Sequence, residues 1–266
     1  MNVNLEEIAL KAKDIAEETG AYIEAERERF NAFEHVERKS LNSLVSYVDK
    51  TAEEKLVDKL GALLPEAGFV TEEGTASESG EDWLWIIDPL DGTTNYIHGI
   101  PCYAVSIGLT YKGVLQVGVV YEITKNENFY AWKEGGCWLN GRRVYVSPQK
   151  NFAASLLATG FPYYDFGKME PYLDLLADLM RNTRGIRRLG SAATDLAYVA
   201  CGRFEGFYEY GLSPWDVAGG ALLVQEAGGY VADFKGDGDY IFGKEIITTN
   251  KHIAEELLTS IKKHLA

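Results

Sequence analysis

The chain has 266 residues, of which 46% are hydrophobic and 12% aromatic, so it can bury a substantial core in one large domain or in two small, tightly joined ones. Its 40 acidic and 26 basic side chains give a net charge of -14, which repels polyanions and argues against nucleic acid as a partner. The longest apolar stretches fall far below the roughly 18 residues of a membrane span. The acidic N-terminus lacks the regions of a signal peptide, so we expect a cytoplasmic protein.

The cysteines and histidines argue against two kinds of site. The cysteines are odd in number, widely spaced and without a Cys-x-x-Cys pair, so we expect buried reduced thiols rather than disulfides or a thiolate metal site. The histidines are scattered without metal-binding spacing, which disfavours a zinc mechanism. These residues are Cys102, Cys137 and Cys201, and His35, His98, His252 and His264.

The N-terminal segment is predicted to be mainly helical. Apolar residues at helical spacing predict one long or kinked helix over residues 5–30. Two short strands are expected between residues 36 and 47. Another amphipathic helix is predicted over 56–64, with Thr51 and Glu54 as a capping box at its start.

Strands dominate the next part of the chain. Residues 68–71 and 83–87 are typical of buried strands, and acidic residues follow each of them. Both strands therefore deliver carboxylates at their C-terminal ends. Residues 103–146 predict an antiparallel meander with a strong hairpin signal at Asn140-Gly141.

Beyond about Ser147 short strands alternate with helices. We therefore predict two subdomains of one body built from layers of helices and sheets. The first, residues 1–146, is an α+β unit with the antiparallel sheet, and the second, residues 147–266, is an α/β unit. The helices expected in the second unit cover residues 171–181, 192–201, 216–227 and a terminal stretch through 253–261, and its strands lie near 156, 186, 204–208, 230–232 and 246–248.

The segment after the apolar strand at 83–87 carries the clearest chemistry, and it reads Asp88-Pro89-Leu90-Asp91-Gly92-Thr93. Two carboxylates at the end of a buried strand are costly to desolvate without a cationic partner. Oxygen ligands suit magnesium, and the Leu90 carbonyl is a possible further ligand. Gly92-Thr93-Thr94 is predicted to open a helical turn whose free amides bind an anion.

Each acidic segment also has a purely structural interpretation. An isolated Asp-Gly-Thr is usually a turn with a helix N-cap, but six residues in this order after such a strand favour a site. Alone, Glu72 would be a solvated loop residue. Asp216 lies in the first turn of an apolar helix, where a carboxylate complements the helix dipole. The small residues Ala218-Gly219-Gly220-Ala221 weaken that helix and indicate close packing of backbone or ligand.

Together these segments resemble the paired signatures of the inositol monophosphatase family, lithium-sensitive and magnesium-dependent phosphatases. Their order and spacing match across nearly the whole chain. The resemblance implies a layered α-β-α-β-α sandwich, two or three Mg²⁺ ions and a homodimer. The matching segments are Glu72-Glu73, Trp85-Ile86-Ile87-Asp88-Pro89-Leu90-Asp91-Gly92-Thr93-Thr94-Asn95 and Trp215-Asp216-Val217-Ala218-Gly219.

The resemblance also implies roles for individual residues. The implied metal ligands are Glu72, Asp88, the Leu90 carbonyl, Asp91 and Asp216, with Glu72 also counted among the catalytic residues. Thr93, paired with Asp49, would orient and deprotonate a metal-bound water. The implied substrate contacts are Gly92, Thr93, Glu209, Ser213 and Asp216.

Two of these assignments keep an alternative, and a further residue, Lys39, has only a loose match to a family lysine near the site. Asp49 lies just before the helix expected at Thr51 and could instead cap it. Glu209, which matches a position that grips a sugar or cyclitol hydroxyl, could be a solvated residue at a strand end.

The implied mechanism is in-line attack on phosphorus by a metal-activated hydroxide. A phosphoaspartate route of the haloacid dehalogenase type is disfavoured, because that route uses Asp-x-Asp, whereas Asp88 and Asp91 are three positions apart. The substrate is expected to be a small phosphorylated polyol or sugar of the inositol 1-phosphate type.

Ser213 stands where animal members of the family carry a histidine and some bacterial members a basic residue, which puts inositol 1-phosphate in question. A 3'(2'),5'-bisphosphate nucleotidase, a fructose 1,6-bisphosphatase or another phosphatase acting on histidinol phosphate or NADP has the same metal core. A non-catalytic binding module that keeps the fold is a remote alternative.

Overall fold

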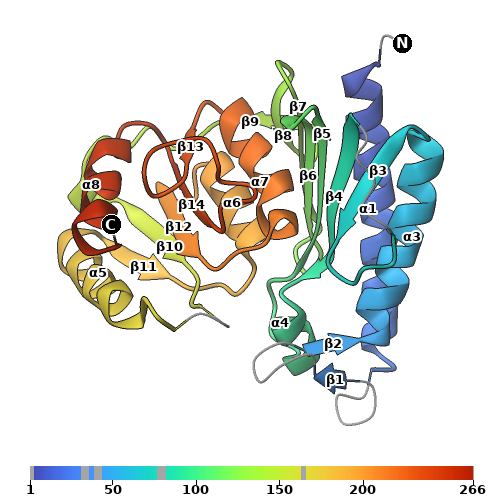
Figure 1. Ribbon diagram of the computed structural model, residues 1–266, viewed down its shortest axis with the longest axis horizontal. Helices are drawn as coiled ribbons and strands as arrows, with labels where there is room; N and C mark the ends of the chain where they lie inside the picture. Colours follow the sequence, from blue (N-terminus) through green and yellow to red (C-terminus); the bar gives the residue numbers. More distant parts are fainter. Residues whose placement is uncertain (1–2, 31–35, 39–43, 77–81, 163–165, 266) are drawn as a thin grey trace.

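The computed structural model describes residues 3–30, 36–38, 44–76, 82–162 and 166–265. Figure 1 shows five layers: helices α1 and α3, a seven-stranded sheet, helices α6 and α7, a five-stranded sheet, and helices α5 and α8. The expected α+β sandwich with the order α-β-α-β-α is confirmed. Each face of each sheet is thus covered by helices, and the three apolar cores lie between the layers.

The first helical layer consists of α1 (Leu5–Arg27) and α3 (Tyr47–Leu63), which cover one face of the seven-stranded sheet. The predicted capping box at Thr51 and Glu54 is wrong, because α3 begins a full turn earlier. Ser46 is its N-cap, and the Asp49 carboxylate accepts the Ser46 N–H at 2.9 Å. Asp49 therefore lies inside the first turn of α3. The short strands β1 (Val36–Arg38) and β2 (Leu44–Ser46) pair antiparallel just before it.

The seven-stranded sheet runs in the order β3-β4-β5-β6-β7-β8-β9, in which only β3 and β4 are parallel. The predicted end of a strand at Ile87 is wrong, since β4 continues through Pro89 to Asp91. Its register shifts between Asp88 and Asp91, an irregularity where proline is tolerated. The strands are β3 (Ala67–Thr71), β4 (Trp83–Asp91), β5 (Ala104–Tyr111), β6 (Val114–Glu122), β7 (Glu127–Trp132), β8 (Gly136–Leu139) and β9 (Arg142–Val144).

The middle layer contains α6 (Ala192–Ala200) and α7 (Pro214–Glu226), which pack on each other and between the two sheets. The small residues of α7 explain how closely it approaches the sheet. A Cβ at Gly219 would lie 2.8 Å from the Val119 carbonyl oxygen and 3.0 Å from that of Ile107. The expected close packing is confirmed, and it is packing against backbone.

The five-stranded sheet has the order β11-β10-β12-β14-β13, with β10 parallel to both of its neighbours and β14 antiparallel to both of its own. Helices α5 (Met169–Asn182) and α8 (Ala254–Leu265) form the outermost layer. The strands are β10 (Leu156–Thr159), β11 (Gly185–Arg187), β12 (Gly206–Tyr210), β13 (Tyr230–Ala232) and β14 (Glu245–Thr249). A 3₁₀ turn at Phe152–Ala154 comes directly before β10.

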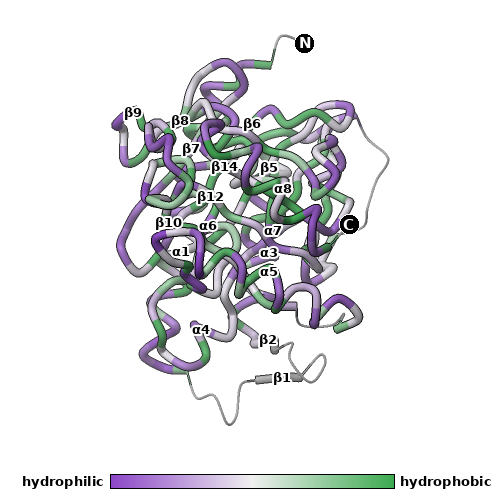
Figure 2. The backbone as a smooth tube through the Cα atoms, turned by 90° about the vertical axis from the view of Figure 1, so that its left-hand side faces the viewer, coloured by the Kyte–Doolittle hydropathy of each residue, from purple (hydrophilic) through white to green (hydrophobic). Residues whose placement is uncertain are grey.

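Polar and apolar residues alternate along the outer helices, where Figure 2 shows purple and green segments following one another. Among the described helices, none combines the length and the apolar character that crossing a membrane requires. Cys102 and Cys137 are buried free thiols, as expected, whereas Cys201 is a free thiol that is only half-buried.

Candidate functional site

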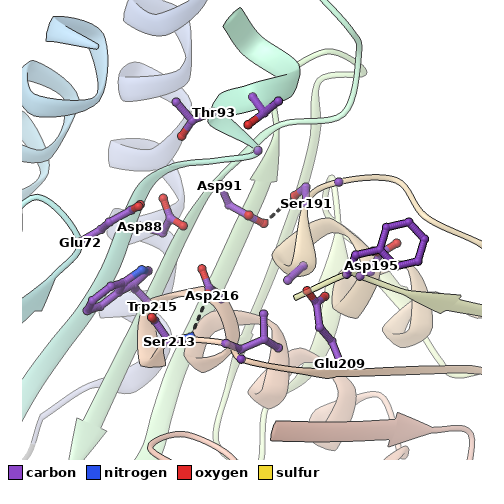
Figure 3. A pocket seen from close by; sticks show the side chains of 18 of the residues that line it. Glu72, Asp88, Asp91, Thr93, Ser191, Asp195, Glu209, Ser213, Trp215 and Asp216 are labelled. Carbon is purple, nitrogen blue, oxygen red and sulfur yellow. Dashed lines mark hydrogen bonds between the residues drawn. The ribbon is translucent and has the colours of Figure 1, made fainter. Parts of the chain in front are cut away.

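The parallel pair β3 and β4 brings two acidic segments to one edge of the seven-stranded sheet. Thr71 is paired with Ile87, so Glu72 and Asp88 follow at the same level. Both side chains line one pocket, and Figure 3 shows them next to each other. The prediction that both strands deliver carboxylates at their C-terminal ends is confirmed.

Three carboxylates converge in this pocket from segments far apart in sequence. Asp88, Asp91 and Asp216 each offer an oxygen, and these oxygens all lie within 4.8 Å of one another. Burial raises the pKa of Asp88 well above its usual range, and the charges of neighbouring acids add to the rise. Burial raises the pKa of Asp91 to about 6. Burial and the negative charge of Asp91 together raise the pKa of Asp216 to about 7. The cluster concentrates negative charge where water stabilises it only weakly, because Asp88 is buried and Asp91 and Asp216 are half-buried.

Hydrogen bonds from the surrounding backbone and Ser191 hold each of the three carboxylates. Asp88 Oδ1 accepts the Leu90 N–H at 2.9 Å. Asp91 Oδ2 accepts the Ser191 hydroxyl at 2.6 Å and the Ala193 N–H at 2.7 Å, both from the start of α6. Asp216 Oδ2 accepts the Ser213 N–H at 2.7 Å. The cluster is therefore fixed by three separate elements before any ligand enters.

Thr93 connects this cluster to Asp49. Its hydroxyl lies 3.0 Å from Asp49 Oδ1 and 3.0 Å from the Leu90 carbonyl oxygen. The other carboxylate oxygen of Asp49 accepts the Ser46 hydroxyl at 2.6 Å. Asp49 is 1% exposed, and burial raises its pKa. The carboxyl both caps α3 and orients the Thr93 hydroxyl at the wall of the pocket.

Gly92, at the turn into α4 (Thr93–His98), could not be another residue without a rearrangement. Its φ of 94° lies in the left-handed region that favours glycine. A Cβ there would also lie 3.0 Å from the Cys102 carbonyl oxygen and 3.2 Å from that of Gly190. The turn therefore fits closely between two other segments of the pocket.

The far side of the pocket comes from the second half of the chain. Glu209 lies at the end of β12 and is only 7% exposed, so the alternative of a solvated glutamate is wrong. Its carboxylate packs on Gly160, where any side chain would overlap it. Ser213 also lines the pocket, together with Arg188 and Asp195.

Three residues that line this pocket were not predicted from the sequence: Arg188, Ser191 and Asp195. Ser191 is the N-cap of α6, and serine just before an apolar helical run is a signal for that position. Asp195 is the single charged residue of the apolar run that forms α6, which is a signal for a buried acid in a special environment. Lys39 lies outside the described residues, and none of the described histidines lines this pocket.

The profile of the inositol monophosphatase family matches residues 4–266, nearly the whole chain. The chain belongs to this family. It is 44% identical over 263 residues to the Nus factor SuhB of Pseudomonas aeruginosa, covering 97% of this chain and 96% of that protein. Two solved structures are similar in fold and sequence. The extragenic suppressor protein suhB of Bartonella henselae has a TM-score of 0.89, 38% identity and coverage of 95% and 97% of the two chains. The inositol monophosphatase of Anabaena (Nostoc) sp. PCC 7120 has a TM-score of 0.86, 35% identity and coverage of 98% of both chains.

Proposed function

We propose that this member of the family is a magnesium-dependent phosphomonoesterase that hydrolyses a small phosphorylated polyol or sugar. The observation that supports the proposal best is the meeting of Asp88, Asp91 and Asp216 within 4.8 Å in a pocket that Gly92 and Thr93 also line. Charges of one sign converge there at a cost in folding stability, which is typical of a site built for a cation and an anionic substrate.

The donor set fits a hard divalent cation. Asp88 is 2% exposed and, like Asp91 and Asp216, has a raised pKa, so the three carboxylates need protons or a cation to remain together. Oxygen donors are the ligands that Mg²⁺ prefers, and Glu72 and the Leu90 carbonyl line the same pocket. We propose these five residues as the metal ligands. When bound, the cation would offset their charge, attract phosphate and lower the pKa of water.

The residues beside the cluster suggest how a proton moves. The Thr93 hydroxyl is within hydrogen-bonding distance of Asp49 Oδ1, so it can donate its own proton there. The Thr93 oxygen then remains free to accept a proton from a water molecule in the pocket. We propose that Asp49 and Thr93 orient the attacking water and take its proton. Gly92 and Thr93 would contact the phosphate.

Several substrates are compatible with this site, because the proposed metal ligands contact the phosphate end of the substrate and do not determine which alcohol the phosphate is esterified to. A phosphate of the inositol 1-phosphate type is our first choice, and Glu209 and Ser213 are proposed to line the position of the alcohol. Nucleoside bisphosphates and fructose 1,6-bisphosphate are the alternatives. Phosphate release from a panel of cyclitol, sugar and nucleotide phosphates, each with and without Mg²⁺, tests the proposal.

Asp91→Asn should abolish release from every substrate of the panel, because it removes one charge from the centre of the cluster. Asp174→Asn is the matched control, since Asp174 is an exposed carboxylate on α5, and it should leave the rate unchanged. The proposal is wrong if the unaltered protein releases phosphate from no substrate, or if Asp91→Asn stays fully active.

A non-catalytic binding role is the second candidate. The observation that favours it is the name of the relatives, Nus factor SuhB, which describes no phosphatase. The same name does not support the expectation that nucleic acid is excluded as a partner. The net charge of -14, in contrast, argues against binding of nucleic acid. A labelled RNA titrated with the protein at low and high salt tests this point, and binding retained by Asp91→Asn would identify a function separate from the pocket.

The remaining features proposed for this protein follow from the sequence or from the family, and no contact in the site bears on them. We propose a cytoplasmic homodimer that binds two or three Mg²⁺ ions and is inhibited by lithium. Sedimentation of the purified protein measures the oligomeric state, and a lithium titration of phosphate release measures inhibition. We also keep the division into subdomains at residues 1–146 and 147–266 as a proposal, which limited proteolysis tests.

A further inference from the structure

The side-chain amide of Asn95 joins two segments that lie far apart in the sequence. Asn95 is buried in the short helix α4, two positions after Thr93. Its Nδ2 donates to the Cys102 carbonyl oxygen at 2.7 Å and to the Leu189 carbonyl oxygen at 2.9 Å. An amide nitrogen carries two hydrogens, so these two bonds use both of them. Asn95 therefore connects the first half of the chain to a segment 94 residues further on.

The backbone on both sides of the Asn95 amide has an unusual conformation. Gly190 has a φ of 96°, and a Cβ there would lie 2.8 Å from Asn95 Nδ2 and 3.1 Å from its Oδ1. Cys102 has a φ of 89°, in a region that residues with a Cβ rarely adopt. Such a conformation costs free energy and persists only where neighbouring contacts fix it. The bond from Asn95 to the Cys102 carbonyl oxygen is one of these contacts.

The two segments that Asn95 joins each carry a group of the proposed site. The helix α4 begins with Thr93, which is proposed to take the proton of the attacking water. The segment that contains Leu189 continues to Ser191, whose hydroxyl donates to Asp91 Oδ2 at 2.6 Å. Thr93 and Ser191 line the pocket, whereas the Asn95 side chain lies behind the pocket wall. Asn95 can therefore affect the reaction only through these neighbours.

A second buried asparagine shows what a purely structural bridge of this kind is. Asn128 is fully buried in β7, and its Nδ2 donates to the Lys13 carbonyl oxygen at 3.2 Å. This bond joins β7 to α1, and neither Asn128 nor Lys13 lines the pocket. Asn95 and Asn128 thus form the same type of bridge, one directly behind the site and the other away from it.

We propose that Asn95 is a positioning residue that fixes Ser191, the donor to Asp91, relative to α4 and Thr93. The inference rests on the proposed phosphatase function and adds a residue to its site. Without the amide, two carbonyl oxygens lose their donor, and the segment at Leu189 is no longer held against α4. A displacement of about 1 Å in an active site can lower a rate about a hundredfold. Loss of the amide therefore lowers kcat and weakens metal binding together.

Asn95→Leu tests the inference, because leucine has nearly the size and shape of asparagine but no donor. We expect kcat to fall about tenfold or more and the Mg²⁺ concentration for half-maximal activity to rise about tenfold. KM for inositol 1-phosphate at saturating Mg²⁺ should change by less than about twofold, because the proposed contacts to the alcohol lie on the far side of the pocket. The Mg²⁺-dependent rise in unfolding temperature needs no turnover, and it should also require about tenfold more Mg²⁺.

Asn128→Leu is the matched control. It should lower stability, because the Lys13 carbonyl oxygen loses a donor, and leave kcat and the Mg²⁺ requirement unchanged. If Asn95→Leu lowers stability alone, or if both variants change kcat equally, the inference is wrong and the proposed function stands. An unaltered protein that releases no phosphate overturns both. If Asn95→Leu does not fold, Asn95→Ser decides, because its hydroxyl keeps one donor: smaller changes of the same kind support the inference, and unchanged kcat and Mg²⁺ requirement overturn it.

Discussion

The Ser191 hydroxyl donates a hydrogen bond to Asp91 Oδ2 over 2.6 Å, across a sequence separation of 100 residues. The Ala193 N–H donates to the same oxygen, so β4 and the start of α6 meet at one carboxylate. Ser191 Oγ also accepts the Thr194 N–H as the N-cap of α6. One hydroxyl therefore helps to hold both a proposed metal ligand and the helix that carries Asp195.

Ser191→Ala is expected to weaken both functions of that hydroxyl. We expect the free energy of unfolding to fall by about 1 to 2 kcal/mol, because a helix loses its cap and Asp91 loses a donor. The Mg²⁺ concentration for half-maximal activity should rise about tenfold, since Asp91 is held less firmly. Denaturant unfolding and a Mg²⁺ titration of phosphate release measure the two effects.

Ser191→Thr is the matched control, because threonine keeps a hydroxyl that can cap the helix. It should retain most of the stability and the Mg²⁺ requirement of the unaltered protein. If Ser191→Ala and Ser191→Thr show the same Mg²⁺ requirement, the hydrogen bond to Asp91 does not position the carboxylate.

The stability of the metal-free protein should fall as pH rises from 5 to 8. The pKa of Asp91 is raised to about 6 and that of Asp216 to about 7, mainly by burial, whereas an unfolded aspartate titrates near 3.8. A folded carboxyl with a raised pKa binds its proton more tightly than the unfolded one, so ionisation costs the folded state free energy. We expect a loss on the order of 2 to 4 kcal/mol across this window, measured by chemical unfolding in a chelator.

Saturating Mg²⁺ should flatten this dependence, because a bound cation stabilises the ionised carboxylates. Asp216→Asn should reduce the slope even without Mg²⁺, since one of the carboxyl groups with a raised pKa is gone. A metal-free protein that becomes more stable between pH 5 and 8 would show that the cluster does not dominate the pH dependence.

The layers of the fold could be predicted from local patterns. The apolar helical spacing in residues 5–30 and the strand pattern in 103–146 reflect the faces that α1 and the meander bury, so the sequence indicates them directly. The start of α3 at Tyr47 was missed, because both Ser46-Asp49 and Thr51-Glu54 resemble capping boxes and only tertiary contacts decide between them. Burial of Asp49 against Thr93 selects the first.

The acidic end of the site was visible in the sequence, whereas on the far side of the pocket only Glu209 and Ser213 were indicated, by the family resemblance. Asp88 and Asp91 lie three positions apart in the last part of one buried strand, so local order indicates their proximity. Arg188 follows β11 and Asp195 lies on α6, so both reach the pocket only through the packing of the second half of the chain against the first, which no local pattern records. The contact between Ser191 and Asp91 is invisible for the same reason.

Glu53 is expected to position the loop that carries Glu72. It is fully buried in α3, where Oε2 accepts the Glu73 N–H at 2.7 Å and Oε1 accepts the N–H and hydroxyl of Thr75 at 2.9 and 2.8 Å. In Glu53→Gln an NH₂ group would face one of these donors. We expect a loss of about 1 to 3 kcal/mol in unfolding free energy and a several-fold rise in the Mg²⁺ requirement.

Glu54→Gln is the control for Glu53→Gln, because Glu54 is the exposed neighbour on the same helix. It should change neither quantity. If Glu53→Gln lowers stability but leaves the Mg²⁺ requirement unchanged, Glu53 supports the fold without positioning Glu72.

Two helical glycines should respond oppositely to alanine. Gly61 in α3 has room, because an added Cβ would lie 3.8 Å from the Phe69 ring, an ordinary contact. Gly61→Ala should therefore stabilise the protein by about 0.5 to 1 kcal/mol, the difference in helix propensity. In α7, Gly219→Ala places a Cβ 2.8 Å from the Val119 carbonyl oxygen, which no rotamer change relieves. We expect Gly219→Ala to cost about 2 kcal/mol or more and to lower activity, because α7 carries Asp216. Denaturant unfolding of both variants measures the two changes in unfolding free energy. If Gly219→Ala leaves that free energy unchanged, α7 is not held against the sheet as closely as the structure shows.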